Sequence, residues 1–258
     1  MPKINRTLDR AIDILQLIHE SKEPLSIKEI SDAMEMPVTS TVDIIHTLLH
    51  RDYLEASENG AKTYKIGSMA YRIGMTYVKD SDILDISKPY LLELEKRINS
   101  TVFLAVKDGS QIMYVNKIEA SGSIRTSASL GARRELYSTG LGKSILALYS
   151  PDEIRNIYDG RILQAFTEYT TTDVETIIRK SYVTRKRGYA IDDQEGDINV
   201  CCVASAIRTN TDMIYAISTA MLRSVDNFNK LNEYGKLVAE YAFEISRKMG
   251  FLGDHIYD

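Results

Sequence analysis

Residues 24–54 read PLSIKEISDAMEMPVTSTVDIIHTLLHRDYL, and this stretch decides the fold of the first part of the chain. Ser26 and Glu29 have the spacing of a capping box, in which two side chains bind free amide groups at a helix start. Pro37 ends this short helix, because proline cannot donate the hydrogen bond that a helix interior needs, and another helix follows over residues 39–50. The apolar positions of that helix follow the spacing of one face: Val42, Ile45 and Leu49. Its other side is polar, so the pair has the pattern of a helix-turn-helix, which presents side chains to a DNA major groove.

The segments on either side of this stretch complete a winged domain. Upstream, residues 8–18 carry apolar side chains at helical spacing: Leu8, Ala11, Ile12, Leu15 and Ile18. Downstream, the dipeptide Asn59-Gly60 is typical of a tight turn between two strands, and residues 63–66 have the pattern of the returning strand. Three helices followed by a β-hairpin predict a winged helix-turn-helix over residues 1–67.

The rest of the chain predicts a linker helix and a second domain of the α+β class. Residues 68–82 return to helical spacing and are expected to link the two domains. Over residues 83–258, hairpins alternate with capped helices, and hairpins that share a sheet with flanking helices indicate an antiparallel sheet rather than a doubly wound parallel one. The expected strands are 101–106, 111–115, 124–127, 189–192, 200–207 and 213–220, and the expected helices include 83–99, 142–149, two that open at capping boxes beginning with Ser150 and Thr172, and 228–250.

Composition and charge exclude several classes of function. The chain has 32 Lys and Arg against 36 Asp and Glu, and this net charge of −4 excludes a generic polycation wrapped on nucleic acid. No apolar run is long enough to span a bilayer and the start lacks the apolar core of a signal peptide, so we expect a cytoplasmic protein with no membrane partner. Cys201 and Cys202 are adjacent and no histidine lies between residues 51 and 254, which argues against a disulfide scaffold, a metal site and most hydrolase mechanisms. We therefore expect no enzyme activity, no metal and no cofactor.

Positive charge is scarce where DNA would bind. Residues 1–67 hold eight Lys and Arg against eleven Asp and Glu, and residues 39–50 hold neither Lys nor Arg. Phosphate contacts would fall to the first helix, the end of the third helix and the wing, and base contacts to hydroxyl and imidazole groups of the third helix. The candidate DNA-binding residues are Arg6, Arg10, Thr39, Ser40, Asp43, His46, Arg51, Lys62 and Lys65. Asp43 is either an acceptor for cytosine N4 or a solvated charge, and a helical docking module without DNA contacts stays open as an alternative.

Two motifs in the second domain suggest ligand chemistry. Gly142-Lys143-Ser144 resembles the end of a phosphate-binding loop, but Tyr137 stands where that loop requires its first glycine. What remains is a helix start at residues 140–142 whose amide groups are free for an anion, or a plain tight turn before a core helix. Residues 192–197 form an acidic loop, which is either a carboxylate pair for acid–base or metal chemistry or, as is more usual for such loops, solvated.

The order and spacing of these motifs resemble the IclR family of bacterial transcriptional regulators over residues 5–252. Residues 7–15, 24–30 and 36–54 are similar to the family's opening helix, its helix-turn-helix and its lead into the wing. The stretches similar to its effector pocket are Gly131 with Arg133, residues 139–143, residues 187–193, Glu195 and residues 202–204.

This resemblance implies a winged helix-turn-helix, a linker helix and a GAF-like effector domain, assembled as a homodimer or homotetramer on double-stranded operator DNA. It also implies the residues that contact a small-molecule effector: Ile124, Leu130, Gly140, Leu141, Asp192, Val200, Cys202, Ser218 and Ala220. Helix-start amides suit a carboxylate, and Asp192 and Ser218 suit hydroxyl groups. We therefore expect a small organic acid or a sugar-derived acid as the effector.

The chain departs from the family's pattern at Asp43 (usually Arg), Tyr137 (usually His), Asn199 (usually Gly) and Ala206 (usually Pro). The leading hypothesis is a ligand-responsive transcriptional regulator, with repression and activation both open. The alternative is a small-molecule sensor of the same fold that acts through protein contacts, which the acidic balance of residues 1–67 favours. A third hypothesis, a nucleotide-dependent enzyme, rests only on Gly142-Lys143-Ser144.

Overall fold

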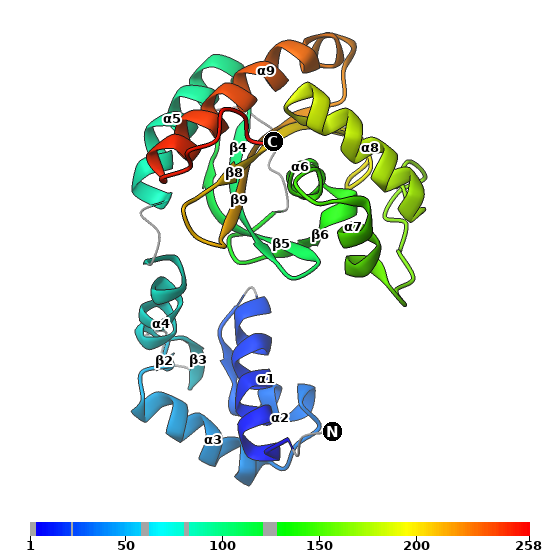
Figure 1. The fold of residues 1–258 in the computed structure, drawn as a ribbon. Helices are drawn as coiled ribbons and strands as arrows, with labels where there is room; N and C mark the ends of the chain where they lie inside the picture. The colour runs from blue at the N-terminus through cyan, green and yellow to red at the C-terminus, as the bar shows by residue number, and fades with distance from the viewer. Residues whose placement is uncertain (1–3, 22, 58–61, 80–82, 121–127) are drawn as a thin grey trace. The chain divides into compact units, whose positions relative to one another are not determined.

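The computed structural model describes residues 4–21, 23–57, 62–79, 83–120 and 128–258 (Figure 1). The chain divides into two compact units, Met1–Asp80 and Ser81–Asp258, and each unit has its own apolar core. The Asn59-Gly60 turn, the strand expected at 124–127 and the end of the expected linker at 80–82 lie outside the described residues. In the described ranges, no helix is both long and apolar enough to cross a membrane.

The first unit packs helices against a small antiparallel sheet. Its helices are α1 (Arg6–Glu20), α2 (Ile27–Ala33), α3 (Val38–His50) and α4 (Ser68–Lys79), and its described strands, in the order β1-β3-β2, are β1 (Leu25–Ser26), β2 (Leu54–Ala56) and β3 (Thr63–Ile66). The capping box predicted for α2 is present: the Glu29 amide donates to Ser26 Oγ at 3.3 Å, and the Ser26 amide donates to Glu29 Oε2 at 2.8 Å. Because α2 and α3 are followed by the paired strands β2 and β3, the winged helix-turn-helix prediction is confirmed.

The buried faces of α1 and α3 differ from those that the spacing predicts. In α1, Leu8 is 62% exposed whereas Ile14 is fully buried. In α3, Ile44 and Leu48 are buried whereas Val42 is only half-buried. Each helix carries two overlapping apolar stripes at helical spacing, and the packing of the helices on one another and on β3 selects the stripe that closes the core.

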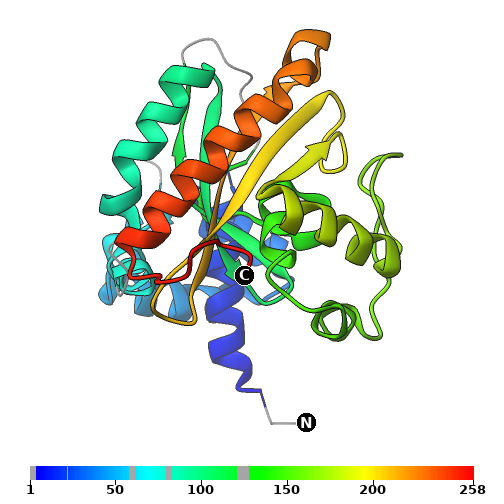
Figure 2. The same cartoon turned by 45° about the horizontal axis from the view of Figure 1, so that its top comes forward.

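The second unit is built on one antiparallel sheet (Figures 1 and 2). In the described part of this unit the strand order is β6-β5-β4-β9-β8-β7. These strands are β4 (Thr101–Asp108), β5 (Gln111–Ile118), β6 (Arg133–Glu135), β7 (Ala190–Asp193), β8 (Val200–Arg208) and β9 (Ile214–Leu222). The strands β4, β5 and β6 pair in sequence order, as do β7, β8 and β9, and the pairing of β4 with β9 joins these two halves of the sheet. The predicted α+β class with an antiparallel sheet is confirmed.

Helices cover both faces of this sheet (Figures 1 and 2). On one face lie α5 (Ile83–Ile98) and α9 (Val225–Lys248), and on the other lie α6 (Gly140–Leu146), α7 (Pro151–Tyr158) and α8 (Val174–Arg187). Ser150 caps α7 as predicted, but Asp173 rather than Thr172 caps α8, because Asp173 Oδ2 accepts a hydrogen bond from the Thr176 amide at 2.8 Å.

The start of α6 is a point of close backbone packing. Thr139 caps the helix, and its Oγ1 accepts a hydrogen bond from the Gly142 amide at 3.0 Å. A Cβ atom at Gly142 would lie 2.2 Å from the carbonyl oxygen of Leu136, so only glycine fits there. A Cβ atom at Gly140 would instead meet the Cys202 side chain at 3.4 Å, which is an ordinary contact.

These two glycines give a matched pair of variants. We expect Gly142→Ala to lower the free energy of unfolding of the second unit by about 2–3 kcal/mol or more, since the added methyl group must displace backbone. Gly140→Ala should change it by no more than about 1 kcal/mol, because space exists and alanine favours the helix. Chemical denaturation followed by circular dichroism measures both. Equal effects of the two substitutions would contradict the close approach of α6 to Leu136.

Candidate functional site

A cavity of about 240 Å³ lies between α6 and the sheet face that α6 covers. The register of the strands explains which residues line the cavity, because residues that lie directly opposite each other on neighbouring strands point to the same face of the sheet. In one such row Cys202 pairs with Ala220 on one side and with Asp192 on the other. The lining residues are Phe103, Tyr114, Ala128, Arg134, Thr139, Gly140, Leu141, Asp192, Gly196, Asp197, Val200, Cys202, Ser218 and Ala220.

Most of the predicted effector residues meet in this cavity. Those that line it are Gly140, Leu141, Asp192, Val200, Cys202, Ser218 and Ala220. Leu130 does not line it: its side chain is 54% exposed, because it lies in a surface turn that the hydrogen bond from the Ala132 amide to the Ser129 carbonyl closes. Ile124 lies outside the described residues. That any of these residues binds a ligand stays a prediction.

The structure adds lining residues that sequence reasoning missed: Phe103, Tyr114, Ala128, Arg134, Gly196 and Asp197. Phe103 and Tyr114 could have been found, since alternation along the first hairpin of the second unit puts both on the inward face. Arg134 and Asp197 carry no such signal, because a charged residue on a short strand or in a turn is usually solvated. Only the folded chain shows that both face a cavity.

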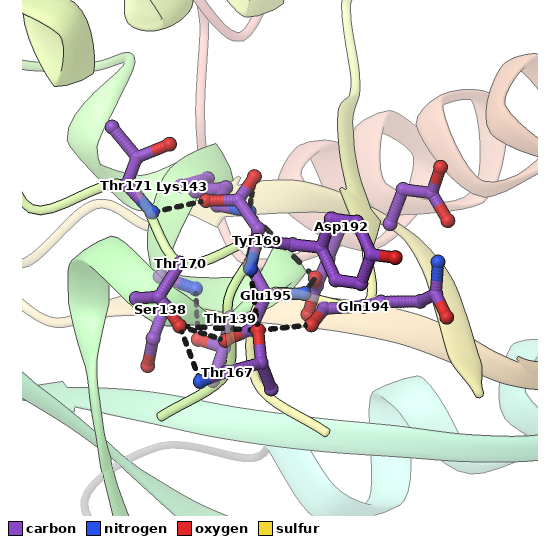
Figure 3. Close-up of polar contacts among 12 residues, drawn as sticks. Ser138, Thr139, Lys143, Thr167, Tyr169, Thr170, Thr171, Asp192, Gln194 and Glu195 are labelled. Carbon is purple, nitrogen blue, oxygen red and sulfur yellow. Dashed lines mark hydrogen bonds and ion pairs between the residues drawn. The ribbon is translucent and has the colours of Figure 1, made fainter. Parts of the chain in front are cut away.

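A buried network of charges forms one wall beside the cavity (Figure 3). Lys143 Nζ on α6 lies 2.6 Å from Glu195 Oε1 and 3.7 Å from Asp192 Oδ1, and all three side chains are less than a tenth exposed. Asp192 Oδ1 also accepts a hydrogen bond from the Glu195 amide at 2.9 Å. The half-exposed Lys180 of α8 reaches Glu195 Oε1 at 3.0 Å, and the Thr171 amide donates to Glu195 Oε2 at 3.1 Å.

This network corrects two interpretations of the sequence. The acidic loop that was expected to be solvated is buried at Asp192 and Glu195, because lysines from two helices neutralise it. Lys143, the lysine of the phosphate-loop-like motif, is committed to these carboxylates and is therefore not free to hold a phosphate. In the described residues, no group of His, Cys, Asp and Glu has the arrangement of a metal site.

Burial and the lysines act differently on the two carboxyl groups. Burial raises the pKa of Asp192 above its ordinary value, and the Lys143 ammonium offsets only part of that effect. Burial acts in the same direction at Glu195, but the ammonium groups of Lys143 and Lys180 outweigh it and lower the pKa of that carboxyl. Asp192 therefore binds a proton more readily than Glu195 does, and it is the carboxyl that gains more from a hydrogen-bond donor on a ligand.

Aromatic and sulfur groups complete the cavity. Phe103 and Tyr114 have ring centroids 5.2 Å apart, a separation typical of favourable aromatic pairs. Burial raises the pKa of the Tyr114 hydroxyl, so it stays protonated and can donate a hydrogen bond. Burial also raises the pKa of the Cys202 thiol well above its ordinary value, so this thiol acts as a neutral, weakly polar wall. Cys201 points the other way, into the core.

The first unit presents most of the predicted DNA-binding residues at its surface. On α3, Thr39, Asp43 and His46 are exposed and Ser40 is half-buried. The basic residues are exposed at Arg6, Arg51, Lys62 and Lys65, while Arg10 is half-buried. Lys65 Nζ lies 2.8 Å from Glu55 Oε1 across the wing strands, which reduces the charge that this lysine offers to a phosphate. DNA contact by any of these residues stays a prediction.

Asp43 has a structural neighbour that the sequence did not reveal. Together with Thr47 it borders a shallow groove on the side of α3 that faces the first turn of α1, where Asn5 and Thr7 form the opposite wall. Asp43 is exposed, so an acidic residue is tolerated at this position of α3 as a solvated charge.

A winged helix-turn-helix and a small cavity lined by polar and aromatic groups in one chain are typical of the class of ligand-responsive DNA-binding regulators. A family model described as IclR helix-turn-helix domain matches residues 7–58, and one described as Bacterial transcriptional regulator IclR C-terminal matches residues 75–247. The chain therefore belongs to the IclR family of bacterial transcriptional regulators, a family of regulators rather than enzymes, and the resemblance of its sequence to that family is confirmed.

Individual relatives agree over nearly the whole chain. The HTH-type transcriptional repressor AllR of Escherichia coli K12 is 28% identical over 247 residues, which cover 95% of this chain and 90% of that protein. The Thermotoga maritima IclR structure is 31% identical, covers 95% of this chain and 99% of its own, and superposes with a TM-score of 0.81. An IclR homologue from Microbacterium hydrocarbonoxydans, crystallised with 4-hydroxybenzoate, shares the fold at 15% identity, with a TM-score of 0.80 and coverage of 95% and 99%.

Departures from the family's pattern have local explanations. Asn199 adopts a φ of 62°, a conformation that favours glycine but that asparagine tolerates. The Ala206 amide donates to the Tyr257 hydroxyl at 3.1 Å, a bond that the family's usual proline could not make. Tyr137 does not line the cavity: its hydroxyl donates to the Gln164 carbonyl at 2.8 Å, and its ring packs on other aromatic rings.

The buried network predicts unequal roles for two lysines that contact the same carboxylate. We expect Lys143→Met to lower the free energy of unfolding by about 3–5 kcal/mol, because it leaves buried carboxylates without their buried cation. Lys180→Met is the matched control, and its half-exposed ion pair should contribute about 1 kcal/mol or less. Urea denaturation followed by circular dichroism compares them. Similar losses for both variants would show that Lys143 is not the cation that holds this wall.

The raised pKa of Asp192 predicts a pH-dependent gain from its removal. A carboxyl whose pKa is higher in the folded than in the unfolded chain loses stability as the pH rises through the folded value. Asparagine keeps the acceptor for the Glu195 amide and does not ionise, so Asp192→Asn should be more stable than wild type by about 0.5–2 kcal/mol at pH 8. The gain should disappear toward pH 4. Melting temperatures between pH 4 and pH 8 test this, and a variant less stable than wild type at pH 8 would contradict it.

Proposed function

We propose that this protein is a transcriptional repressor that binds operator DNA through its first unit and a small organic acid in the cavity of its second unit. The observation that carries the proposal is the cavity itself, which combines a guanidinium, two carboxylates, hydroxyl groups and an aromatic pair next to the start of α6. Repression, rather than activation, is supported by the relative AllR, which is named a repressor.

On the DNA side, α3 would lie in the major groove and the basic residues would hold the backbone. The exposed hydroxyl and imidazole groups of Thr39 and His46 would read base edges. Arg6, Arg51 and Lys62 would contact phosphates on either side. Since α3 carries no cation, sequence-independent attraction to DNA should be weak, and binding should depend on two copies that reach two half-sites. We therefore propose a homodimer or homotetramer, acting in the cytoplasm.

On the effector side, the size and chemistry of the cavity favour a compact acid. Its volume of about 240 Å³ is below the usual range for small-molecule sites, about 300–1,000 Å³. Arg134 would pair with a carboxylate, the amides of Gly140 and Leu141 would add partial positive charge, and Asp192 with Ser218 would bind hydroxyl groups. The homologue crystallised with 4-hydroxybenzoate supports this class, since that ligand is a small organic acid.

Ligand binding would act on DNA binding by shifting an equilibrium between two arrangements of the assembled protein. The effector must bind one arrangement more tightly than the other for this to occur. The helix α4 (Ser68–Lys79), which precedes the second unit in the chain, is the element through which we propose that the shift reaches the recognition helices.

A second candidate function is a sensor of the same fold that acts through protein contacts. The excess of acidic over basic residues in the first unit and the carboxylate of Asp43 on α3 favour it. The two candidates differ in one property, which is whether the wild-type protein binds DNA.

Fluorescence anisotropy with DNA from upstream of the protein's own gene separates them. We expect wild type to form a salt-sensitive complex. Asp43→Arg should lower the dissociation constant of that complex at least about threefold. It should also increase the slope of log affinity against log salt concentration by about the value of one phosphate contact. Glu233→Arg on α9 of the second unit is the matched control, since this exposed residue allows the same change in net charge outside the first unit. Binding by Asp43→Arg with none by wild type would establish the sensor instead, and no binding by either would also contradict the repressor.

A further inference from the structure

We propose that Arg134 selects an anionic effector and that Asp197 occupies its guanidinium while no effector is bound. This proposal rests on the proposed function, in which the cavity is the effector site. A ligand carboxylate would replace the Asp197 carboxylate on Arg134, so that ligand entry opens an ion pair within the protein. The effector class is then a compact monoanion whose carboxylate lies on the Arg134 side of the cavity.

Arg134 and Asp197 come from opposite edges of the sheet. Arg134 lies on β6 and Asp197 lies in the turn that follows β7, and these strands are the two ends of the strand order in the described residues. Nevertheless, Arg134 Nη2 lies 3.6 Å from Asp197 Oδ1, and both residues line the cavity. The Arg134 side chain from one edge strand and the turn beyond the other edge strand therefore meet at the cavity.

The charges that line the cavity leave Arg134 as its anion-binding group. Arg134 is the one cation among the described lining residues, which also include the carboxylates of Asp192 and Asp197. Asp192 is already held by the Glu195 amide and lies near Lys143 behind the wall. Asp197 is the more exposed of the pair it forms with Arg134, so it can turn toward water at little cost when a ligand arrives.

The geometry of the pair leaves the guanidinium with unused donors. A charge-assisted hydrogen bond measures about 2.7–2.9 Å, so the Arg134–Asp197 contact is a long one. Among the described residues, the Arg134 side chain has this one ion pair and no hydrogen bond. A guanidinium offers five N–H donors in a planar fork that matches both oxygens of a carboxylate. A small carboxylate could therefore make a closer, bidentate contact where Asp197 makes a single long one.

Arg133, which precedes Arg134 on β6, differs from it in direction and in the pairing of its charge. Successive residues of a strand point to opposite faces, and Arg133 points away from the cavity. Its Nη2 lies 2.7 Å from Asp108 Oδ2, so its charge is already paired closely. The family resemblance placed Arg133 at the effector pocket, but Arg133 does not line the cavity, so it is a matched control for the loss of one arginine from β6.

Tyr114 indicates where the rest of the ligand would lie. Burial raises the pKa of its hydroxyl, so the group stays protonated, and Tyr114 lines the same cavity as Arg134 and Asp197. A carboxylate on Arg134 would place the body of a small ligand against the rings of Tyr114 and Phe103, with the Ser218 hydroxyl on the same face of the sheet.

The two partners of this ion pair should respond to mutation with opposite signs. Asp197→Asn removes the internal competitor and should tighten binding of an acid at least about threefold. Arg134→Met should weaken it at least about tenfold, because a bidentate charged contact is lost. Arg134→Lys, which keeps the charge without the fork, should fall between wild type and Arg134→Met, and Arg133→Met should bind as wild type does.

Isothermal titration and thermal melting of the full-length protein test this with defined probes. The probes are 4-hydroxybenzoate, pyruvate and gluconate as acids, and 4-hydroxybenzamide as the neutral counterpart of the first. Melting without ligand shows whether each variant folds. Opposite shifts for Asp197→Asn and Arg134→Met, seen with an acid and not with the amide, support the proposal.

Several results would overturn it. If Arg134→Met binds the acid as tightly as wild type, or if both variants weaken binding equally, Arg134 does not select the anion, although an acid effector in the cavity would stand. Equal binding of 4-hydroxybenzoate and 4-hydroxybenzamide would also show that Arg134 does not select the anion. If no acid binds wild type or Asp197→Asn, the selection of anions fails, while DNA binding by the first unit is judged separately by anisotropy.

Discussion

One buried lysine holds the candidate effector site together. Lys143 projects from α6 and lies between the carboxylates of Asp192 and Glu195, which belong to β7 and the turn after it. Charges this deep are stabilising only when they are paired and hydrogen-bonded, so α6 and this turn must keep their relative positions. Since Gly140 and Leu141 at the start of α6 and Asp192 with Asp197 on the other side all line the cavity, the shape of the cavity depends on this contact.

The two units use charge in opposite ways. The second unit buries Lys143 with Asp192 and Glu195 and neutralises these charges internally, and Arg134 is the one cation among the described residues that line the cavity. The first unit carries more acidic than basic residues and leaves the polar side of α3 exposed without a cation. Weak general attraction to DNA follows from that surface, and a protein of this kind should bind where two recognition helices and two wings act together.

The sequence predicted the fold well and the site in part. Helical spacing and the capping box at Ser26 located the helix-turn-helix, and the family resemblance located most of the residues that share a wall with Cys202. Spacing could not decide between Leu8 and Ile14 as the buried side of α1, because both lie on apolar stripes. The burial of Glu195 could not be predicted either, since it depends on lysines that are distant in sequence.

The cavity and the DNA-binding surface should be coupled, and operator affinity with and without ligand tests this coupling most directly. An acid that raises the melting temperature of the protein would be added at saturation while anisotropy records the dissociation constant of the operator complex. We expect the acid to weaken that complex by about fivefold or more, and the operator to weaken acid binding by the same factor. An unchanged operator affinity with the cavity filled would contradict this coupling.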